Sequence, residues 1–219
     1  MNDSENSFWR RNSLTLVLVA CMLASLAGQI VMGRAVYNDQ RADFGAAPVG
    51  WLAYLESGHF VSATFENWES EFLQMGMYVL LAVSLRQKGS AESRPLKKSE
   101  EEERIEPGPK PWPIRAGGIW KTLYGHSLAI AFALLFLLSF CLHLDGSWRS
   151  ENAERLLKGE PAVSLIRYAK GTEFWFESFQ NWQSEFLAVA SLVLLTIWLR
   201  QKDSPQSKPL DAPHSQTGT

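Results

Sequence analysis

The sequence predicts an all-α integral membrane protein with four transmembrane helices. These are arranged as two tandemly repeated helical hairpins, with short amphipathic helices in the outer loops. Three observations predict this fold class. Only 46% of the residues are hydrophobic, yet they gather in long runs; the second half of the chain repeats the first; and basic residues flank the apolar runs.

Two apolar runs are long enough to cross a bilayer. Residues 13–31 contain no charged side chain, and the ionisable residues of 126–144 are histidines at its two ends and a cysteine. At about 1.5 Å per helical residue, each run spans roughly the 30 Å of a hydrocarbon core. We therefore expect transmembrane helices over about 13–33 and 126–144. Neither run has a polar face, which argues against a buried helix in a soluble core.

Cys21 and Cys141 lie inside these runs and are expected to pack as small apolar residues. The segment before Cys21 resembles a bacterial lipoprotein signal, and residues 25–27 resemble a signal-peptidase site. However, apolar sequence continues past Cys21 to Met32, and the second half of the chain carries an equivalent run in mid-chain. We expect the first helix to be retained, without lipidation at Cys21.

The repeat reveals two further crossings. Residues 13–96 align with residues 127–210 at a constant offset of 114 without a gap, and about a third of the positions are identical. The matches cluster in the segments FENWESEFLQ and FQNWQSEFLA. Each of these segments opens a shorter apolar stretch that starts near a tryptophan and ends at Arg-Gln-Lys, as a membrane helix does. We infer a tandem duplication, with crossings over about 67–85 and 181–199.

The remaining segments differ in composition. A charge run and a proline-rich stretch lie between the two repeats, and such sequences cannot bury a core. The predicted organisation is a cytoplasmic N-terminus (1–12), a first membrane repeat (13–88), a disordered cytoplasmic linker (89–120), a second membrane repeat (121–202) and a disordered tail (203–219).

The basic residues predict the orientation. If both termini and the linker share one side, that side holds 14 of the 21 Lys and Arg residues. This distribution predicts a multi-pass membrane protein with both termini cytoplasmic. The two hairpins then share one orientation and are related by an axis along the membrane normal. In the outer loops, residues 48–57 and 162–169 have helical spacing, and Asn38 and Asn152 could tie the long helices to them.

The repeated motif supplies a candidate ion or proton site. Helical geometry places Asn67 and Glu71 on one face, and the second copy repeats them. Ionisable side chains within a membrane are usually paired or face a polar cavity, and two carboxylates that share a site can hold a proton or a cation. The candidate site comprises Glu71, Glu185, Asn67, Asn181, Ser70 and Ser184, and Trp68 and Trp182 are the expected interface anchors.

Other ionisable residues near the motif are not repeated. Glu66 and Glu69 align with glutamines in the second copy, and His143 has no matching histidine. The selection of Glu71 and Glu185 depends on their presence in both copies.

A structural interpretation of the same motif is simpler. Asn67 would cap a helix that starts at the motif, Glu71 would meet the positive end of its dipole, and Trp68 would anchor it at the interface. We therefore place a structural or partner-binding membrane module first. A small proton- or cation-linked transporter or channel subunit is the alternative, and a membrane-bound enzyme is a distant third.

The sequence predicts no catalytic residue, cofactor or metal site. Spacings typical of zinc or haem ligands and glycine-rich phosphate loops are missing from it. With 21 basic and 23 acidic residues, the charge balance does not favour nucleic acid as a partner. The expected partner is the lipid bilayer. Because four helices make a thin wall for a pore, a transport role would also need a homodimer or another membrane partner.

Several blocks of the chain resemble a known family. These are the paired ENWESEFLQ and QNWQSEFLA blocks, the RQKGSAES and RQKDSPQSKP segments after them, and the central PWPIRAGG. They resemble an uncharacterised bacterial multi-pass membrane protein family, a domain of unknown function with a duplicated NWxSEFL motif. The resemblance covers nearly the whole chain. It implies a bacterial setting and several transmembrane helices, and no known activity or site residue.

Overall fold

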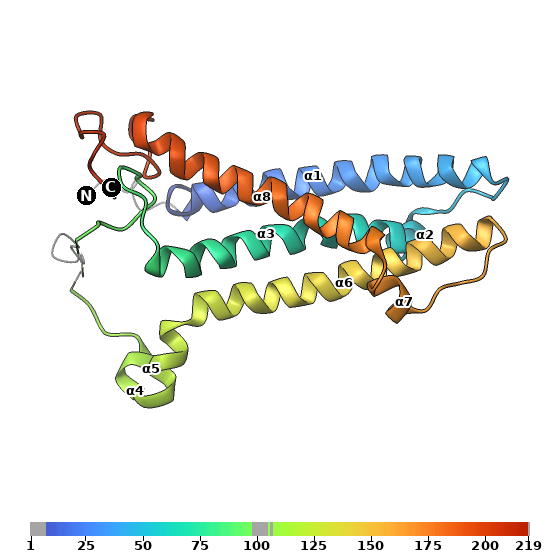
Figure 1. The fold of residues 1–219 in the computed structure, drawn as a ribbon, viewed down its shortest axis with the longest axis horizontal. Helices are drawn as coiled ribbons and strands as arrows, with labels where there is room; N and C mark the ends of the chain where they lie inside the picture. Colours follow the sequence, from blue (N-terminus) through green and yellow to red (C-terminus); the bar gives the residue numbers. More distant parts are fainter. Residues whose placement is uncertain (1–7, 98–104, 106, 219) are drawn as a thin grey trace. The chain divides into compact units, whose positions relative to one another are not determined.

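The structure is a computed structural model that describes residues 8–97, 105 and 107–218. Within these residues every regular element is an α-helix and no strand occurs, so the predicted all-α class is confirmed (Figure 1). In chain order the helices are α1 (Phe8–Asp43), α2 (Trp51–Leu55), α3 (Gly58–Ser84), α4 (Trp112–Ala116), α5 (Gly118–Gly125), α6 (Ser127–Leu157), α7 (Leu165–Ala169) and α8 (Thr172–Trp198).

Among the described residues, two helices, α1 and α6, are long and apolar enough to cross a membrane. Their apolar stretches are exposed: none of the stretch in α1 and 11% of that in α6 is buried. A core helix of a soluble protein would be mostly buried instead. The helices α3 and α8 have 27 residues each, but polar side chains in their first halves keep their mean hydropathy below that expected of a membrane-spanning helix. Two helices of the structure therefore have the dimensions of a membrane crossing.

The repeated motif lies inside a helix and not at its start. Helix α3 begins at Gly58 and α8 at Thr172, well before the motif in each copy. The prediction that Asn67 caps a helix is therefore wrong. The backbone N–H groups near Asn67 already have carbonyl partners one turn earlier, so neither a cap nor the dipole explains the motif's polar residues.

The chain divides into two compact units, and the division falls within α3 and α6. The first unit comprises Met1–Thr64 and Leu144–Ala169, and the second comprises Phe65–His143 and Lys170–Thr219. The first unit therefore holds α1, α2, α7, the start of α3 and the second half of α6. The second unit holds the rest of α3 and α6 together with α4, α5 and α8.

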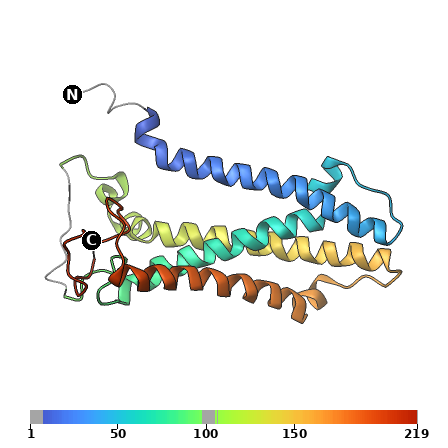
Figure 2. The ribbon, with the colours of Figure 1, turned by 90° about the horizontal axis from the view of Figure 1, so that it is seen from above.

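In the first unit, an asparagine ties each long helix to the chain that follows it. The Asn38 side chain accepts a hydrogen bond from the Val49 N–H (2.8 Å) and donates one to its carbonyl (3.3 Å). Asn152 makes the same pair of bonds with Val163 (2.8 and 3.1 Å). The expectation that these asparagines hold the following loops is confirmed. As a result, α2 folds back along the end of α1 (Figure 2).

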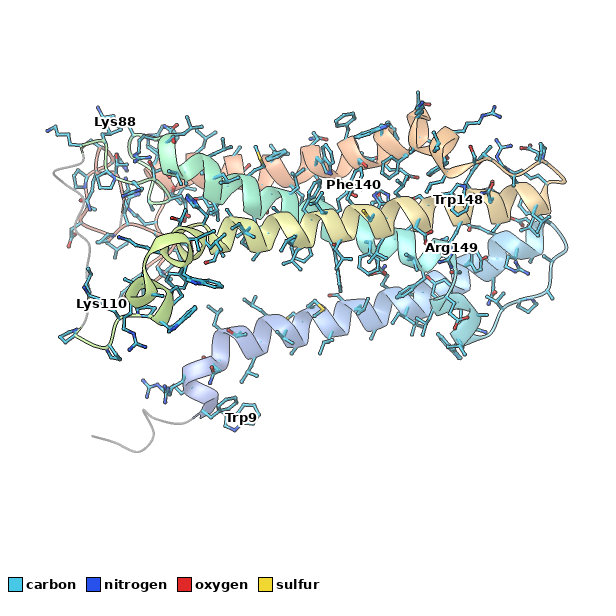
Figure 3. The ribbon with its side chains drawn as sticks, turned by 90° about the horizontal axis from the view of Figure 1, so that it is seen from below. Trp9, Lys88, Lys110, Phe140, Trp148 and Arg149 are labelled. Carbon is cyan, nitrogen blue, oxygen red and sulfur yellow. The ribbon has the colours of Figure 1, made fainter. Side chains whose placement is uncertain are left out.

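Small residues allow α3 and α6 to approach closely in the first unit. A Cβ atom added to Gly58 or to Gly146 would collide with the backbone of the other helix. Beside this crossing, the Ser62 and Ser147 hydroxyls are hydrogen-bonded at 2.5 Å. Arg149, labelled in Figure 3, donates from α6 to the Glu56 carbonyl at the end of α2.

In the second unit, the predicted linker contains helical residues, and the predicted tail forms hydrogen bonds with the chain before it. The predicted linker (89–120) includes α4 and the start of α5; the charge run at 100–104 lies outside the described residues. In the predicted tail, Lys208 is 1% exposed, and its ammonium group donates to backbone carbonyls. These acceptors are the carbonyls of Gly89, Ile197, His214 and Gln216.

Candidate functional site

The second unit contains a fully buried contact between a glutamate on α3 and a histidine on α6. Glu69 and His143 each have a relative exposure of 0%. The Glu69 Oε2 atom lies 2.7 Å from His143 Nδ1. A carboxylate can only accept a hydrogen bond, so Nδ1 carries the hydrogen in this contact. The other Glu69 oxygen, Oε1, accepts a hydrogen bond of 2.9 Å from the indole N–H of Trp182 on α8. One carboxylate thus connects three helices.

The second ring nitrogen of His143 faces another carboxylate. His143 Nε2 lies 3.6 Å from Glu177 Oε2, which is longer than a direct hydrogen bond. The Glu177 side chain is 34% exposed, whereas that of Glu69 is 1% exposed. The imidazole therefore stands between a solvent-accessible carboxylate and an inaccessible one. This is the arrangement of a proton relay, because imidazole can accept a proton at one nitrogen and donate from the other.

A third carboxylate joins the cluster through an amide. The Asn181 side chain donates one hydrogen bond to the Glu66 carboxylate and another, of 3.1 Å, to the Glu177 carbonyl. We name Glu66, Glu69, His143 and Glu177 the acid–histidine cluster. It joins three carboxylates to one imidazole, so full ionisation leaves an excess of negative charge in a poorly hydrated place. Such a cluster favours the uptake of protons.

Aromatic rings pack beside the buried part of the acid–histidine cluster. The His143 ring lies 4.9 Å from the ring of Phe174, which is 1% exposed. Further ring contacts of 5.4–6.4 Å follow along α6 and α8 and reach the indole that binds Glu69. The rings in these contacts are Phe136, Phe140, Phe174, Trp175, Phe179 and Trp182. Low polarity around the cluster strengthens its internal electrostatic interactions.

The structure places the predicted site residues on α3 and α8, and it brings Glu71 and Glu185 near enough for their charges to interact. Glu71 is exposed and Glu185 is half-buried. The Glu185 backbone carbonyl accepts a hydrogen bond from the buried Gln74 side chain (2.7 Å), which links α3 to α8. The Ser70 and Ser184 hydroxyls each donate to the carbonyl three residues earlier in their own helix, at 2.8 Å. A shared site at Glu71 and Glu185 stays a prediction.

Two predicted residues do reach the acid–histidine cluster, and one predicted anchor lies elsewhere. Asn181 and Trp182 bind Glu66 and Glu69. Trp68 instead packs edge-on against Phe65, with ring centroids 5.3 Å apart. Equivalent positions of the two motifs therefore have different surroundings.

Sequence reasoning missed the four members of the acid–histidine cluster because it selected residues present in both copies. The positions equivalent to Glu66, Glu69, His143 and Glu177 hold Gln180, Gln183, Gln29 and Ala63. The useful signal was the opposite one: ionisable residues that occur in one copy and are neutral in the other.

Other sites in the described residues are less developed. A cavity of about 160 Å³ in the first unit lies between the ends of α1 and α6. Two of its charged lining residues are already engaged, since Arg41 donates to the Ala47 carbonyl and Glu154 pairs with Lys158 at 2.5 Å. No group of His, Cys, Asp and Glu side chains in the described part of the chain has the arrangement of a metal site.

Comparison with known proteins identifies the family. A family model described as Domain of unknown function (DUF6766) matches residues 5–219. The chain belongs to this family. The resemblance to an uncharacterised domain family is therefore confirmed over nearly the whole chain. No curated protein and no solved structure matches it.

Proposed function

We propose that this protein is a multi-pass bacterial inner-membrane protein in which α1, α3, α6 and α8 cross the bilayer and both termini are cytoplasmic. The exposed apolar surfaces of α1 and α6 support crossings by these two helices. For α3 and α8, support comes from the bias of basic residues and from the arginines that follow their last turns. Arg86 and Arg200 each donate to the final carbonyls of the preceding helix, which suits a cytoplasmic helix end.

Equivalent contacts support the tandem duplication. Besides the two asparagine bridges, the Gln87 N–H binds the Ser93 hydroxyl and the Gln201 N–H binds the Ser207 hydroxyl, both at 2.9 Å. Gly45 and Gly159, also 114 positions apart, have φ angles of 70° and 72°. The same turn chemistry at the same offset is expected of two copies of one hairpin.

The function that the geometry supports best is proton-linked transport or conduction through the acid–histidine cluster. The observation that carries this proposal is the 2.7 Å contact between Glu69 and His143, both fully buried. The pair lies at the boundary of the predicted crossings, where ionisable residues are usually paired or face a polar cavity and often have a functional role.

The cluster suggests a route for the proton. Glu69 opens the predicted crossing 67–85 and His143 lies at the outer end of 126–144, so both belong to the outer membrane boundary. Glu177 exchanges protons with the outer solution and passes one to His143 Nε2. The imidazolium then releases its Nδ1 proton to Glu69 and keeps the proton on Nε2, so one transfer leaves the imidazole neutral in its other tautomer and moves one positive charge inward. Before the next transfer, Glu69 must pass its proton on and the imidazole must return to the tautomer that carries the hydrogen on Nδ1.

A structural role for the same cluster is the second candidate function. The same cluster links α3, α6 and α8, and a buried pair can fix how helices associate. In that case the protein is a structural or partner-binding membrane module, and the pair serves to hold the helices together.

The experiment is a proton-flux assay in proteoliposomes loaded with a pH-sensitive dye. We expect wild-type vesicles to acidify faster than empty ones, and the Glu69→Gln and His143→Gln variants to lose this flux while retaining native helix content. The matched control is Glu71→Gln combined with Glu185→Gln, which makes the same Glu→Gln change at nearby positions outside the cluster and should retain the flux. Loss of flux in the control alone would favour the pair predicted from the repeat. Wild-type vesicles no faster than empty ones would refute the transport proposal and leave the structural module.

A further inference from the structure

The segment before α6 has an unusual charge distribution. From Pro107 to Leu144 the sequence contains no Asp or Glu, and its three basic residues, Lys110, Arg115 and Lys121, all precede α6. All three are exposed. Figure 3 shows Lys110 directly before α4. The local charge is therefore positive, although the whole chain has a formal net charge of -2.

The helices α4 and α5 form a small folded unit with a defined shape. The rings of Trp112 on α4 and Trp120 on α5 lie 5.3 Å apart. Between the helices, Gly117 and Gly118 have φ angles of 70° and 52°, which side chains other than glycine rarely adopt. This turn allows α4 to fold back against α5 (Figure 1). The basic residues and the aromatic rings are thus held together before the crossing begins.

The apolar side chains of this pair are exposed in the structure. Ile119 is 69% exposed, and Trp112, Trp120, Leu123 and Tyr124 are between 45% and 56% exposed. On α5 the apolar residues follow helical spacing, and Lys121 lies on the opposite side of the helix. Tryptophan and tyrosine beside basic residues are typical of helices that lie in the headgroup region of a bilayer.

We infer that the α4–α5 pair is a docking surface for anionic phospholipid headgroups of the cytoplasmic leaflet. The partner is argued from charge complementarity: the three cations, in a stretch (107–144) whose sequence contains no acidic residue, match phosphate groups, and the exposed rings match the layer just below them. This inference rests on the proposed membrane topology and adds to it a selectivity for one class of lipid. The pair thereby fixes the depth at which α6 enters the bilayer.

The selectivity can be measured by fluorescence quenching in the full-length protein, reconstituted in nanodiscs. The reporter is a bimane label on Ile119→Cys in a Cys21→Ala, Cys141→Ala background, because both native cysteines are free and exposed. The quenchers are phosphatidylglycerol and phosphatidylcholine brominated near the glycerol end. Competition between them gives the relative association constant at the label. A second label on Leu134→Cys, in the apolar part of α6, reports insertion without lipid selectivity.

Each basic side chain near an anionic surface contributes roughly fivefold in affinity, so three allow a preference for phosphatidylglycerol between about tenfold and a hundredfold at Ile119. Replacing Lys110, Arg115 and Lys121 by glutamine should reduce this preference to about one. The charge-retaining variant Lys110→Arg, Arg115→Lys, Lys121→Arg should keep it. High salt should weaken the preference of the wild type and leave the glutamine variant unchanged.

The outcomes separate the two proposals. If the Leu134 label is quenched equally by both lipids and the Ile119 label shows no preference, the lipid-docking inference is wrong and the membrane topology stands. If neither lipid quenches the Leu134 label, the topology itself fails. An Ile119 preference that survives in the glutamine variant would also overturn the inference, because the basic residues would not be its cause.

Discussion

Replacing Glu69 by alanine tests the energetic role of the acid–histidine cluster most directly. The change removes the acceptor of two buried hydrogen bonds, one from the His143 imidazole and one from the Trp182 indole. Both donors would remain in place, and no water reaches the site easily because His143 is 0% exposed. The variant therefore loses two contacts and leaves the buried imidazole and the part-buried indole N–H without their acceptor.

The expected cost follows from these contacts. A hydrogen bond to a charged group contributes about 1.5–3 kcal/mol, so two contribute about 3–6 kcal/mol. Breaking a buried pair by removing one partner costs about 3–5 kcal/mol, which agrees with that sum. We expect Glu69→Ala to lower the free energy of unfolding by about 4 kcal/mol. Glu69→Gln keeps the shape and can still accept from Trp182, so it should cost only about 1–2 kcal/mol.

The assay is equilibrium unfolding in detergent micelles by steric trapping or denaturant, followed by tryptophan fluorescence. Glu71→Ala is the matched control, since Glu71 is an exposed acid on the same helix, and its effect should stay within about 0.5 kcal/mol. If Glu69→Ala changes stability by less than about 1 kcal/mol, or if Glu71→Ala costs as much, the cluster does not stabilise the fold as we argue.

Three further predictions concern other parts of the molecule. Burial lowers the pKa of His59 from 6.5, so the unfolded state binds a proton before the folded state does as the pH falls. The free energy of unfolding should therefore be highest above pH 6.5 and decline below it. In His59→Phe, the thermal midpoint should depend less on pH than in the wild type. A flat wild-type profile would contradict this. Lys208→Met removes a charged hydrogen-bond donor to several carbonyls, and this loss costs about 1.5–3 kcal/mol. Limited proteolysis should therefore cleave the tail at least about tenfold faster. Unchanged cleavage would mean that Lys208 does not hold the tail. Gly146→Ala would drive a methyl group into the Ser62 backbone and should cost about 1–3 kcal/mol of unfolding free energy, while Gly28→Ala, with open space around it, is the control and should cost nothing; equal effects would reject the close helix crossing.

The sequence predicts the all-helical class and the presence of α1 and α6 well, because an uninterrupted apolar run of this length is typical of a membrane-spanning helix. Helix boundaries were harder. The helices α3 and α8 start before the motif, since residues ahead of it also have helical spacing and no proline interrupts them. The composition of the tail predicts disorder, but a single side chain, Lys208, forms four hydrogen bonds there. Averages over a segment do not detect such a contact.

The acid–histidine cluster could not be predicted from the repeat. Glu69 and His143 are 74 positions apart and meet through the packing of α3 against α6, which depends on the fold. The repeat favoured Glu71 and Glu185 because both copies retain them. A duplicated scaffold needs its shared residues for shape, whereas a site used once needs residues that differ between the copies. For this reason, the polar differences between the repeats indicate the candidate site better than the identities do.

The measurement that tests the central claim most directly is an infrared titration of the carboxyl groups in lipid-reconstituted protein, comparing wild type with Glu66→Gln. Burial raises the pKa of Glu66, whereas Glu69 accepts from the imidazole as a carboxylate. We predict a protonated carboxylic-acid band in the wild type at neutral pH that is missing in Glu66→Gln and unchanged in Glu71→Gln with Glu185→Gln. Such a band would show that the acid–histidine cluster holds a proton at the membrane boundary. A spectrum in which all carboxyl groups are ionised at neutral pH, or a band lost in the Glu71 and Glu185 variant instead, would contradict the proposal.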